Sequence, residues 1–531
     1  METPSPEQQA LQNPIILQTI FQNESLSTKN LRLVCNLWNE IILSLPQPKL
    51  SLRLTKRSES KKPSNCCDAV PFQTFCVKME PKLAKCIIDY GCQKPALHSP
   101  SQRSSTAASR LLHVCDKFSQ IIEEVTITFV EADFVPTLYE ILQNCCPNLK
   151  KVELYFRPRG LHDEYMPSQS MIPLRVKPKL TSIRIVDPTA QFLKMTQMII
   201  NSAPNLTRFF YHGKRYPNLS RRGTVKWIQV DMSRMKLKDI SNCGSTNGLN
   251  EMLDHVKNHL RVLVIANNFD LHDVQDNINW GDDDDWNDDS DHEDNVANNH
   301  ELDFEDDNWD DDVGIELSDE DDEDYDIERI AFKIPKMKSL KMFENHLVDG
   351  FTCGDALQDI CTARLPALET LKLSSAYLSS TNMDDLLQNA MRSKNLFTGV
   401  KNLHLTDVRD PKSIIGLGQV FTNLETLSIR LLNNGMEDRL GTAVEWVGLC
   451  EELFARGLKN CTMEIVPMGI EVDLLVLHIE RMKQCLLLMK KVKNVSATIK
   501  CMKFKEETWK WMDPFIRDNK IPIKFETLHS G

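Results

Sequence analysis

The sequence has few glycines and lacks any long apolar run. Its 531 residues include 19 glycines, and none of them forms the glycine-rich loop that cradles a nucleotide phosphate. No stretch approaches the roughly 20 consecutive apolar residues that cross a bilayer, and the polar residues 1–11 lack the pattern of a secretory signal. No spacing of serine, histidine, cysteine or carboxylate residues matches a catalytic motif. We therefore expect no enzyme activity, no catalytic residue, no cofactor and no membrane insertion.

The 16 cysteines do not indicate a disulfide framework. Cys66 and Cys67 are adjacent in the sequence, as are Cys145 and Cys146, and many other cysteines lie in apolar runs. There a free thiol behaves as a small hydrophobic side chain. No C-x-x-C pair is present, so a structural zinc site has little support. We expect reduced cysteines, no metal, and residence in the cytoplasm, the nucleus or both.

The formal net charge of −12 hides an uneven distribution. Residues 281–326 contain 25 Asp or Glu and no Lys or Arg, whereas the rest of the chain contains 63 basic and 50 acidic residues. Self-repulsion and a lack of apolar residues prevent such a segment from folding alone. We interpret it as an acidic disordered insert in a basic folded body. It is either a solvated loop or a segment that lays its charges and aromatic residues on a basic surface of the body or of a partner.

An internal repeat, L-x-x-L-x-L with conservative substitutions, runs through the folded body. Neighbouring copies mostly begin 24 to 32 residues apart, one interval of 54 is close to two units, and one of 80 contains the acidic insert. The last two apolar residues of a copy alternate with polar residues, as a half-buried strand requires. The copies are Leu149-Val152-Leu154, Leu180-Ile183-Ile185, Leu206-Phe209-Tyr211, Leu260-Leu263-Ile265, Leu340-Phe343-Asn345, Leu368-Leu371-Leu373, Val400-Leu403-Leu405 and Leu424-Leu427-Ile429.

A helical pattern precedes several copies. Residues 135–145, 192–199 and 386–391 have apolar residues at i, i+3 and i+4 spacing. Units of one helix, one turn and one strand bury their apolar faces only by stacking on neighbours. The predicted fold class is therefore α/β: a leucine-rich-repeat solenoid, or horseshoe, with a helical module before it. The alternative is an ordinary α/β protein with frequent leucines.

The predicted organisation has seven parts. Residues 93–109, which are rich in Ser, Pro and Ala, are predicted to be a loop within the third part. The parts are a disordered tail (1–12), a helical module (13–46), a linker with the first solenoid elements and a flexible loop (47–110), repeats (111–280), the acidic insert (281–326), further repeats (327–440) and C-terminal repeats or a cap (441–531).

The helical module has a recognisable pattern. Pro14 suits the first turn of a helix, an apolar stripe follows it, and Ser27 or Thr28 can cap a second helix. The pattern resembles the F-box, in which a proline-led helix ends in Ile-Phe, a helix starts at Leu-Ser, and Val-Cys is followed three residues later by Trp. The matching positions are Pro14, Ile20-Phe21, Leu26-Ser27, Val34-Cys35 and Trp38.

This resemblance implies a three-helix module that binds a Skp-family adaptor and, through it, the cullin scaffold of a ubiquitin ligase. F-box proteins with C-terminal leucine-rich repeats form a recognised subgroup, so the two halves of the chain support each other. The alternative is an N-terminal helical cap that packs on the first repeat. The residues expected to serve the core of the module and the adaptor surface together are Pro14, Leu17, Ile20, Phe21, Leu31, Val34 and Trp38.

In the same resemblance, the repeats hold a protein target for ubiquitination. The target would bind the concave face, which is lined by the x positions of the repeats, and the candidates are Lys151, Glu153, Arg184, Lys372 and His404. Each of them is also interpretable as a solvated surface residue. A non-ligase scaffold whose acidic insert binds basic partners is the alternative function. Direct nucleic-acid binding is less favoured, because Lys and Arg are scattered along the sequence and the insert would compete.

Overall fold

The structure is a computed structural model that divides into two units, one comprising Met1–Asp270 with Arg329–Gly531 and the other Leu271–Glu328. The second unit and the whole acidic insert lie outside the described residues. The structure describes residues 11, 13–21, 34–44, 52–54, 76, 81–89, 100–130, 134–156, 172–188, 190–213, 215–220, 222–232, 243–266, 334–346, 361–374, 383–392, 396–408, 411–414, 416–433, 458–467, 483, 487, 496–501, 506–521 and 523–527.

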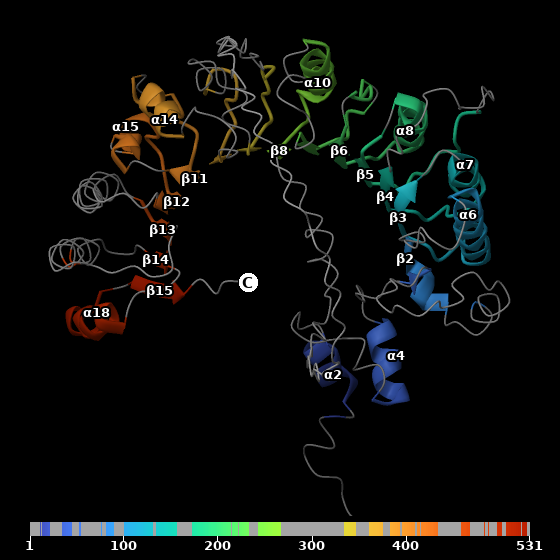
Figure 1. The fold of residues 1–531 in the computed structure, drawn as a ribbon, viewed down its shortest axis with the longest axis horizontal. Helices are drawn as coiled ribbons and strands as arrows, with labels where there is room; N and C mark the ends of the chain where they lie inside the picture. The colour runs from blue at the N-terminus through green and yellow to red at the C-terminus, as the bar shows by residue number, and fades with distance from the viewer. Residues whose placement is uncertain are drawn as a thin grey trace, which may run out of the picture. The chain divides into compact units, whose positions relative to one another are not determined.

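One parallel sheet of fifteen strands organises the described part of the first unit, and its strands pair in sequence order (Figure 1). The strands are β1 Leu52–Arg53, β2 Cys86–Asp89, β3 Glu124–Val130, β4 Lys151–Phe156, β5 Ser182–Val186, β6 Arg208–His212, β7 Trp227–Asp231, β8 Val262–Ala266, β9 Met342–Asn345, β10 Thr370–Leu373, β11 Asn402–Val408, β12 Thr426–Asn433, β13 Asn460–Pro467, β14 Ser496–Cys501 and β15 Ile523–Thr527.

Helices connect many of these strands. The α-helices in the described residues are α2 Pro14–Phe21, α4 Asn36–Ser44, α6 Pro100–Lys117, α7 Val135–Asn144, α8 Ala190–Ser202, α10 Cys243–Val256, α14 Met383–Met391, α15 Leu417–Val420 and α18 Glu506–Asn519. Two 3₁₀ helices, η1 and η3, span Pro81–Lys85 and Pro411–Ile414.

The apolar residues of each copy point into a single core. Val152 of β4 is in register with Ile183 of β5, which is in register with Phe209 of β6. These side chains belong to one buried cluster with helix residues such as Leu138 and Ile199. The anchor, defined here as the first apolar residue of each copy, is buried in the same cluster. This arrangement of anchored turns and parallel strands in sequence order is the leucine-rich-repeat organisation that the spacing predicts.

The structure also contains repeats beyond the eight copies identified from the sequence. Strand β7 fills the interval of 54 residues, with Val225 as its anchor and Ile228 and Val230 in the core. Its three positions hold Val225, Ile228 and Val230 and no leucine, so the leucine-based pattern does not identify this copy. The sheet also continues past residue 440 through β13, β14 and β15.

The predicted loop at 93–109 is wrong in part, because helix α6 begins at Pro100. Serine and proline at the start of a segment are compatible with the first turn of a helix. What stabilises α6 is the apolar stripe that starts at Ala108 and continues through Leu111, Val114 and Cys115 into the core. Tertiary packing of this stripe therefore overrides the weak local propensity of the serines.

One backbone carbonyl links each turn to the next. The carbonyl of the residue after the anchor accepts two consecutive N–H groups from the following repeat. The Thr181 carbonyl, for example, accepts from Thr207 at 2.9 Å and from Arg208 at 3.0 Å. The same pattern occurs at the corresponding residues of the other turns, namely Glu123, Lys150, Thr207, Lys226, Arg261, Lys341, Glu369, Lys401 and Glu425.

The residue before the anchor joins the turns through its side chain. The amide nitrogens of Asn148, Asn205 and Asn423 donate to carbonyls of the preceding turn, those of Gln120 at 2.6 Å, Pro178 at 2.8 Å and Thr398 at 2.7 Å. Gly399 holds the same position in its turn. There the chain passes so close to the preceding turn that an added Cβ would lie 3.0 Å from the Leu368 carbonyl oxygen. The side chain that fits before the anchor therefore depends on how closely each turn approaches the preceding one.

Gly399→Ala should destabilise the protein by about 1–2 kcal/mol, because the new methyl group overlaps a backbone carbonyl that is held by its neighbours. The matched control is Gly223→Ala, whose Cβ would meet only the His259 ring at 3.4 Å. We expect the control to change stability by less than about 0.5 kcal/mol. Urea unfolding midpoints followed by circular dichroism measure both, and equal midpoints for the two variants would contradict the close approach at Gly399.

Candidate protein-binding surfaces

The side chains between the two core residues of each strand form the middle row of the sheet face that points away from the core, which we call the open face. Four of the five predicted target-binding residues lie in this row. Glu153 is in register with Arg184, and Lys372 is in register with His404. Lys151 lies on β4 beside Glu153. The row runs in register through Thr126, Glu153, Arg184, Phe210, Gln229, Val264, Glu344, Lys372, His404 and Ser428.

At β3–β6 the side chains of the open face contact one another. The Lys151 ammonium lies 3.0 Å from Glu153 Oε1, and the Thr126 hydroxyl donates to Glu153 Oε2 at 3.2 Å. Burial opposes the charge on Lys151, but the Glu153 carboxylate outweighs burial and holds the pKa of Lys151 above its usual value. The Arg184 guanidinium lies 4.1 Å from the centre of the Phe210 ring, a cation–π geometry. This end of the row is preorganised by contacts within the chain.

At β9–β11 a second cluster surrounds Glu344. Its carboxylate lies 3.0 Å from the Lys372 ammonium and 2.7 Å from His346 Nε2. Burial alone would raise the pKa of Glu344, but the hydrogen bonds from His346 and Lys372 outweigh it and leave the pKa below its usual value. His404 stands in register beyond Lys372. Burial, together with the Lys372 charge, lowers the pKa of His404.

Sequence reasoning missed Phe210, Glu344 and His346 on this face. The repeat pattern could have identified two of them, since Phe210 lies between the core residues of one repeat and Glu344 between those of another. The copy that holds Glu344 was recognised but is irregular, because Asn345 replaces its last leucine.

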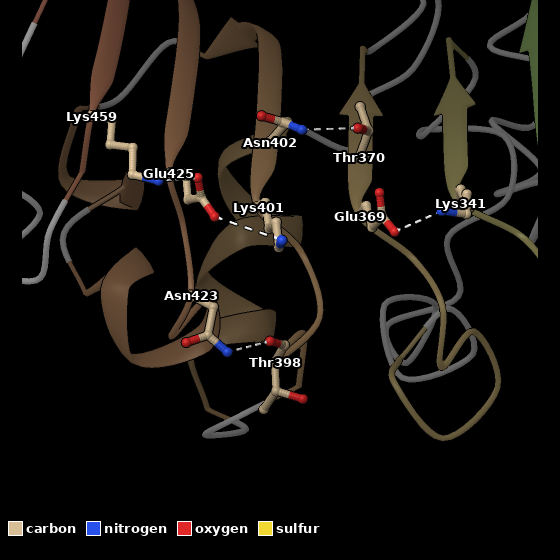
Figure 2. A network of polar contacts seen from close by, with 9 residues as sticks. All are labelled: Lys341, Glu369, Thr370, Thr398, Lys401, Asn402, Asn423, Glu425 and Lys459. Atoms are coloured by element: carbon tan, nitrogen blue, oxygen red, sulfur yellow. Dashed lines mark hydrogen bonds and ion pairs between the residues drawn. The ribbon is translucent and has the colours of Figure 1, made fainter.

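Charged residues also line the amino-terminal edge of the sheet, where the strands begin. From β9 to β13 the residue after the anchor alternates in sign between turns, with ion pairs of 3.0 Å for Lys341–Glu369, 3.8 Å for Lys401–Glu425 and 2.6 Å for Glu425–Lys459 (Figure 2). A hydrogen bond from Lys459 lowers the pKa of Glu425. Glu123 is likewise 3.4 Å from Lys85 and 2.9 Å from Lys150. We call this arrangement the charge ladder.

The N-terminal helices α2 and α4 have a small core of their own, made by Leu17, Phe21, Ile41 and Ile42. The Trp38 ring packs on it, 5.1 Å from the Phe21 ring in an edge-to-face arrangement, and its indole N–H donates to the Leu11 carbonyl at 3.3 Å. Of the predicted adaptor-binding residues, Leu17 and Phe21 are therefore buried and Trp38 is half-buried.

The remaining predicted residues divide differently. Pro14, Ile20 and Val34 are exposed, and Leu31 lies outside the described residues, as does the helix start predicted at Ser27 or Thr28. Helix α4 begins at Asn36, after Val34 and Cys35. Filling the small core leaves apolar side chains in solvent at Ile15, Ile16, Ile20, Val34 and Leu37, with Ile15 75% exposed. We call these five residues the apolar surface of the helical pair.

No group of three or more His, Cys, Asp or Glu residues within the described residues is placed to hold a metal ion. Among the described helices, none is both long enough and apolar enough to cross a bilayer.

Comparison with known proteins gives no family. No family model and no curated protein matches the chain. Among solved structures, the leucine-rich repeat-containing protein LegL7 from Legionella pneumophila is similar at 10% identity, over 86% of this chain and 91% of that chain, with a TM-score of 0.30. The assignment of the repeat fold therefore depends on the strand order and register of this chain itself.

Protonation of His404 in the unfolded chain should lower the free energy of unfolding as the pH falls from about 7.5 to 5.5. Because its folded pKa lies below the unfolded value, the unfolded chain takes up this proton first, and stability is lost as the pH falls through about 6.5. His404→Gln removes the proton uptake, so its urea midpoint should fall less over this range than that of the wild type. His259→Gln, which removes an exposed histidine, is the matched control. An unchanged slope in His404→Gln would contradict the prediction.

Proposed function

We propose that this chain is a substrate-recognition adaptor of a Skp–cullin–F-box ubiquitin ligase. In this proposal the helical pair docks on the Skp-family adaptor, and the sheet holds a protein target. The observation that supports it most is the apolar surface of the helical pair, which remains exposed after the small core is filled. Five exposed apolar side chains on one small helical pair are a candidate protein-binding site, since large apolar residues left in solvent together mark such sites.

The geometry of the helical pair suits a helix-in-groove contact. Ile16 and Ile20 are one turn apart on α2, so they lie on one side of the helix. Leu17 and Phe21, also one turn apart, lie on the side that faces α4. One stripe of α2 thus stabilises the pair while the next stripe is free for a partner.

The sheet supports the second half of the proposal. Its open face presents charged, aromatic and apolar side chains at a fixed spacing set by strand pairing, which suits recognition of a protein surface. The adaptor itself would need no catalytic residue, because it acts by raising the concentration of the target near the ubiquitin donor.

The test is capture of a purified Skp-family adaptor by the full-length chain. The double variant Ile16→Asp, Ile20→Asp should weaken capture roughly 30-fold or more, since it places two charges in the contact that the proposal assigns to a hot spot. Both side chains are exposed, so the variant should keep the circular dichroism spectrum of the wild type. Isothermal calorimetry measures the affinity.

Two matched variants separate contact from folding. Gln18→Glu adds a charge to α2 on the side of the Leu17–Phe21 stripe that is opposite to Ile16 and Ile20. It should leave capture of the adaptor unchanged. Leu17→Asp places a charge in the small core and should unfold the pair, with loss of both helical signal and capture. If the wild type binds no Skp-family adaptor, the ligase proposal fails, and a scaffold role for the chain and its acidic insert takes its place.

A further inference from the structure

The charge ladder is interrupted in the middle of the sheet. On either side of the interruption, basic residues at the amino-terminal edge have acidic partners in an adjacent turn, as at Lys85, Lys150 and Lys341. At the strands β6, β7 and β8 between them, Lys226 and Arg261 hold the position after the anchor, where the turn of β6 has Thr207. Arg208, the first residue of β6, adds a third positive charge one position later. All three are basic and exposed, and we call them the basic strip.

The basic strip has no counter-charge in the described part of the chain. Among the described residues, no ion pair or side-chain hydrogen bond joins any of its members to another residue, although their backbone N–H groups bond to the preceding turns. Adjacent strands are about 4.8 Å apart, so like charges on neighbouring turns oppose folding slightly. A ladder that is neutralised elsewhere thus leaves a local excess of positive charge at this one place.

Apolar side chains adjoin the basic strip in the same strands. Trp227 of β7 is in register with Arg208 on one side and Val262 on the other, and Val262 is in register with Met342 of β9. Trp227, Val262 and Met342 are half-buried, so part of each remains in contact with solvent. The result is a row of apolar side chains beside a row of cations, and the two can be contacted together by one extended segment.

We infer that the basic strip, with Trp227, Val262 and Met342 beside it, binds an acidic and partly apolar segment of the protein target. This inference rests on the proposed function and adds the chemistry of what the sheet recognises. Three unpaired cations over about 10 Å match a short run of carboxylates. Nucleic-acid binding typically draws on roughly 6–10 phosphate contacts, and the acidic side chains of the flanking turns would repel a longer polyanion.

The probe for this site is a fluorescein-labelled peptide of alternating glutamate and leucine, and binding is measured by fluorescence anisotropy with the full-length chain. Binding should weaken with rising salt, because the strip is exposed to screening. Lys226→Glu should reduce affinity on the order of 10-fold or more, since it replaces attraction by repulsion. The same substitution gives Arg208 and Arg261 an opposite charge, so the unfolding midpoint should stay equal or rise.

A matched control and two further probes complete the test. Lys459→Glu makes the same change at the same repeat position of β13 and should leave peptide affinity unchanged. An equal loss in Lys226→Glu and Lys459→Glu would overturn the assignment to the strip. Alternating lysine–leucine peptide should not bind. A single-stranded oligonucleotide that binds more tightly than the acidic peptide and depends on Lys226 would overturn the assignment to a protein segment.

Cross-linking distinguishes a partner from the chain's own acidic residues. A zero-length carbodiimide reagent should join Lys226 to carboxylates of the probe. Products that join Lys226 only to residues 281–326 of the same chain would overturn the assignment to a partner. The variant Ile16→Asp, Ile20→Asp should bind the peptide as the wild type does, so failure of adaptor capture and failure of the basic strip are separable results.

Discussion

The shared backbone carbonyl after each anchor is the contact on which the rest of the fold depends. It accepts two N–H groups from the next repeat, from Glu123 near the start of the described sheet to Glu425 near its end. This contact involves no side chain and therefore tolerates any residue at that position. It fixes the register of neighbouring strands, so residues far apart in the sequence become neighbours in rows. The loops between strands can differ in length by tens of residues without disturbing those rows, because loop closure costs little more for a longer loop.

Because strand pairing aligns the repeats, residues that differ between repeats become neighbours on the surface. The rows that face the core are apolar except at Asn345, while the open face and the amino-terminal edge vary from turn to turn. Glu153 and Glu344 each find a basic neighbour on an adjacent strand or on their own strand, and the charge ladder repeats this neutralisation along the edge. The basic strip stands out against that background, since Lys226 and Arg261 follow each other without an acid between them. A repeat protein can carry such a local departure because each turn is stabilised chiefly by its own neighbours.

In the helical pair, the sequence alone does not show which apolar residues of α2 are buried. Leu17 and Ile20 are both apolar, both lie on α2 and both fit an amphipathic stripe. Only the position of α4 decides that Leu17 is buried against Ile42 whereas Ile20 is left in solvent. The two residues therefore have opposite consequences when substituted, one for folding and the other for the proposed contact with a Skp-family adaptor.

The sequence by itself determined the repeat, its α/β class and most of its strands, because a buried anchor and two alternating apolar residues have a strong and periodic signature. It also determined that Glu153, Arg184, Lys372 and His404 lie between core positions and so face away from the core. Only the tertiary structure decided which of these residues are neighbours, since strand pairing joins turns across intervals as different as 26 and 80 residues. It also decided that β7 belongs to the sheet and that α6 replaces a predicted loop. In both cases packing against adjacent repeats supplies the free energy that local sequence preference lacks.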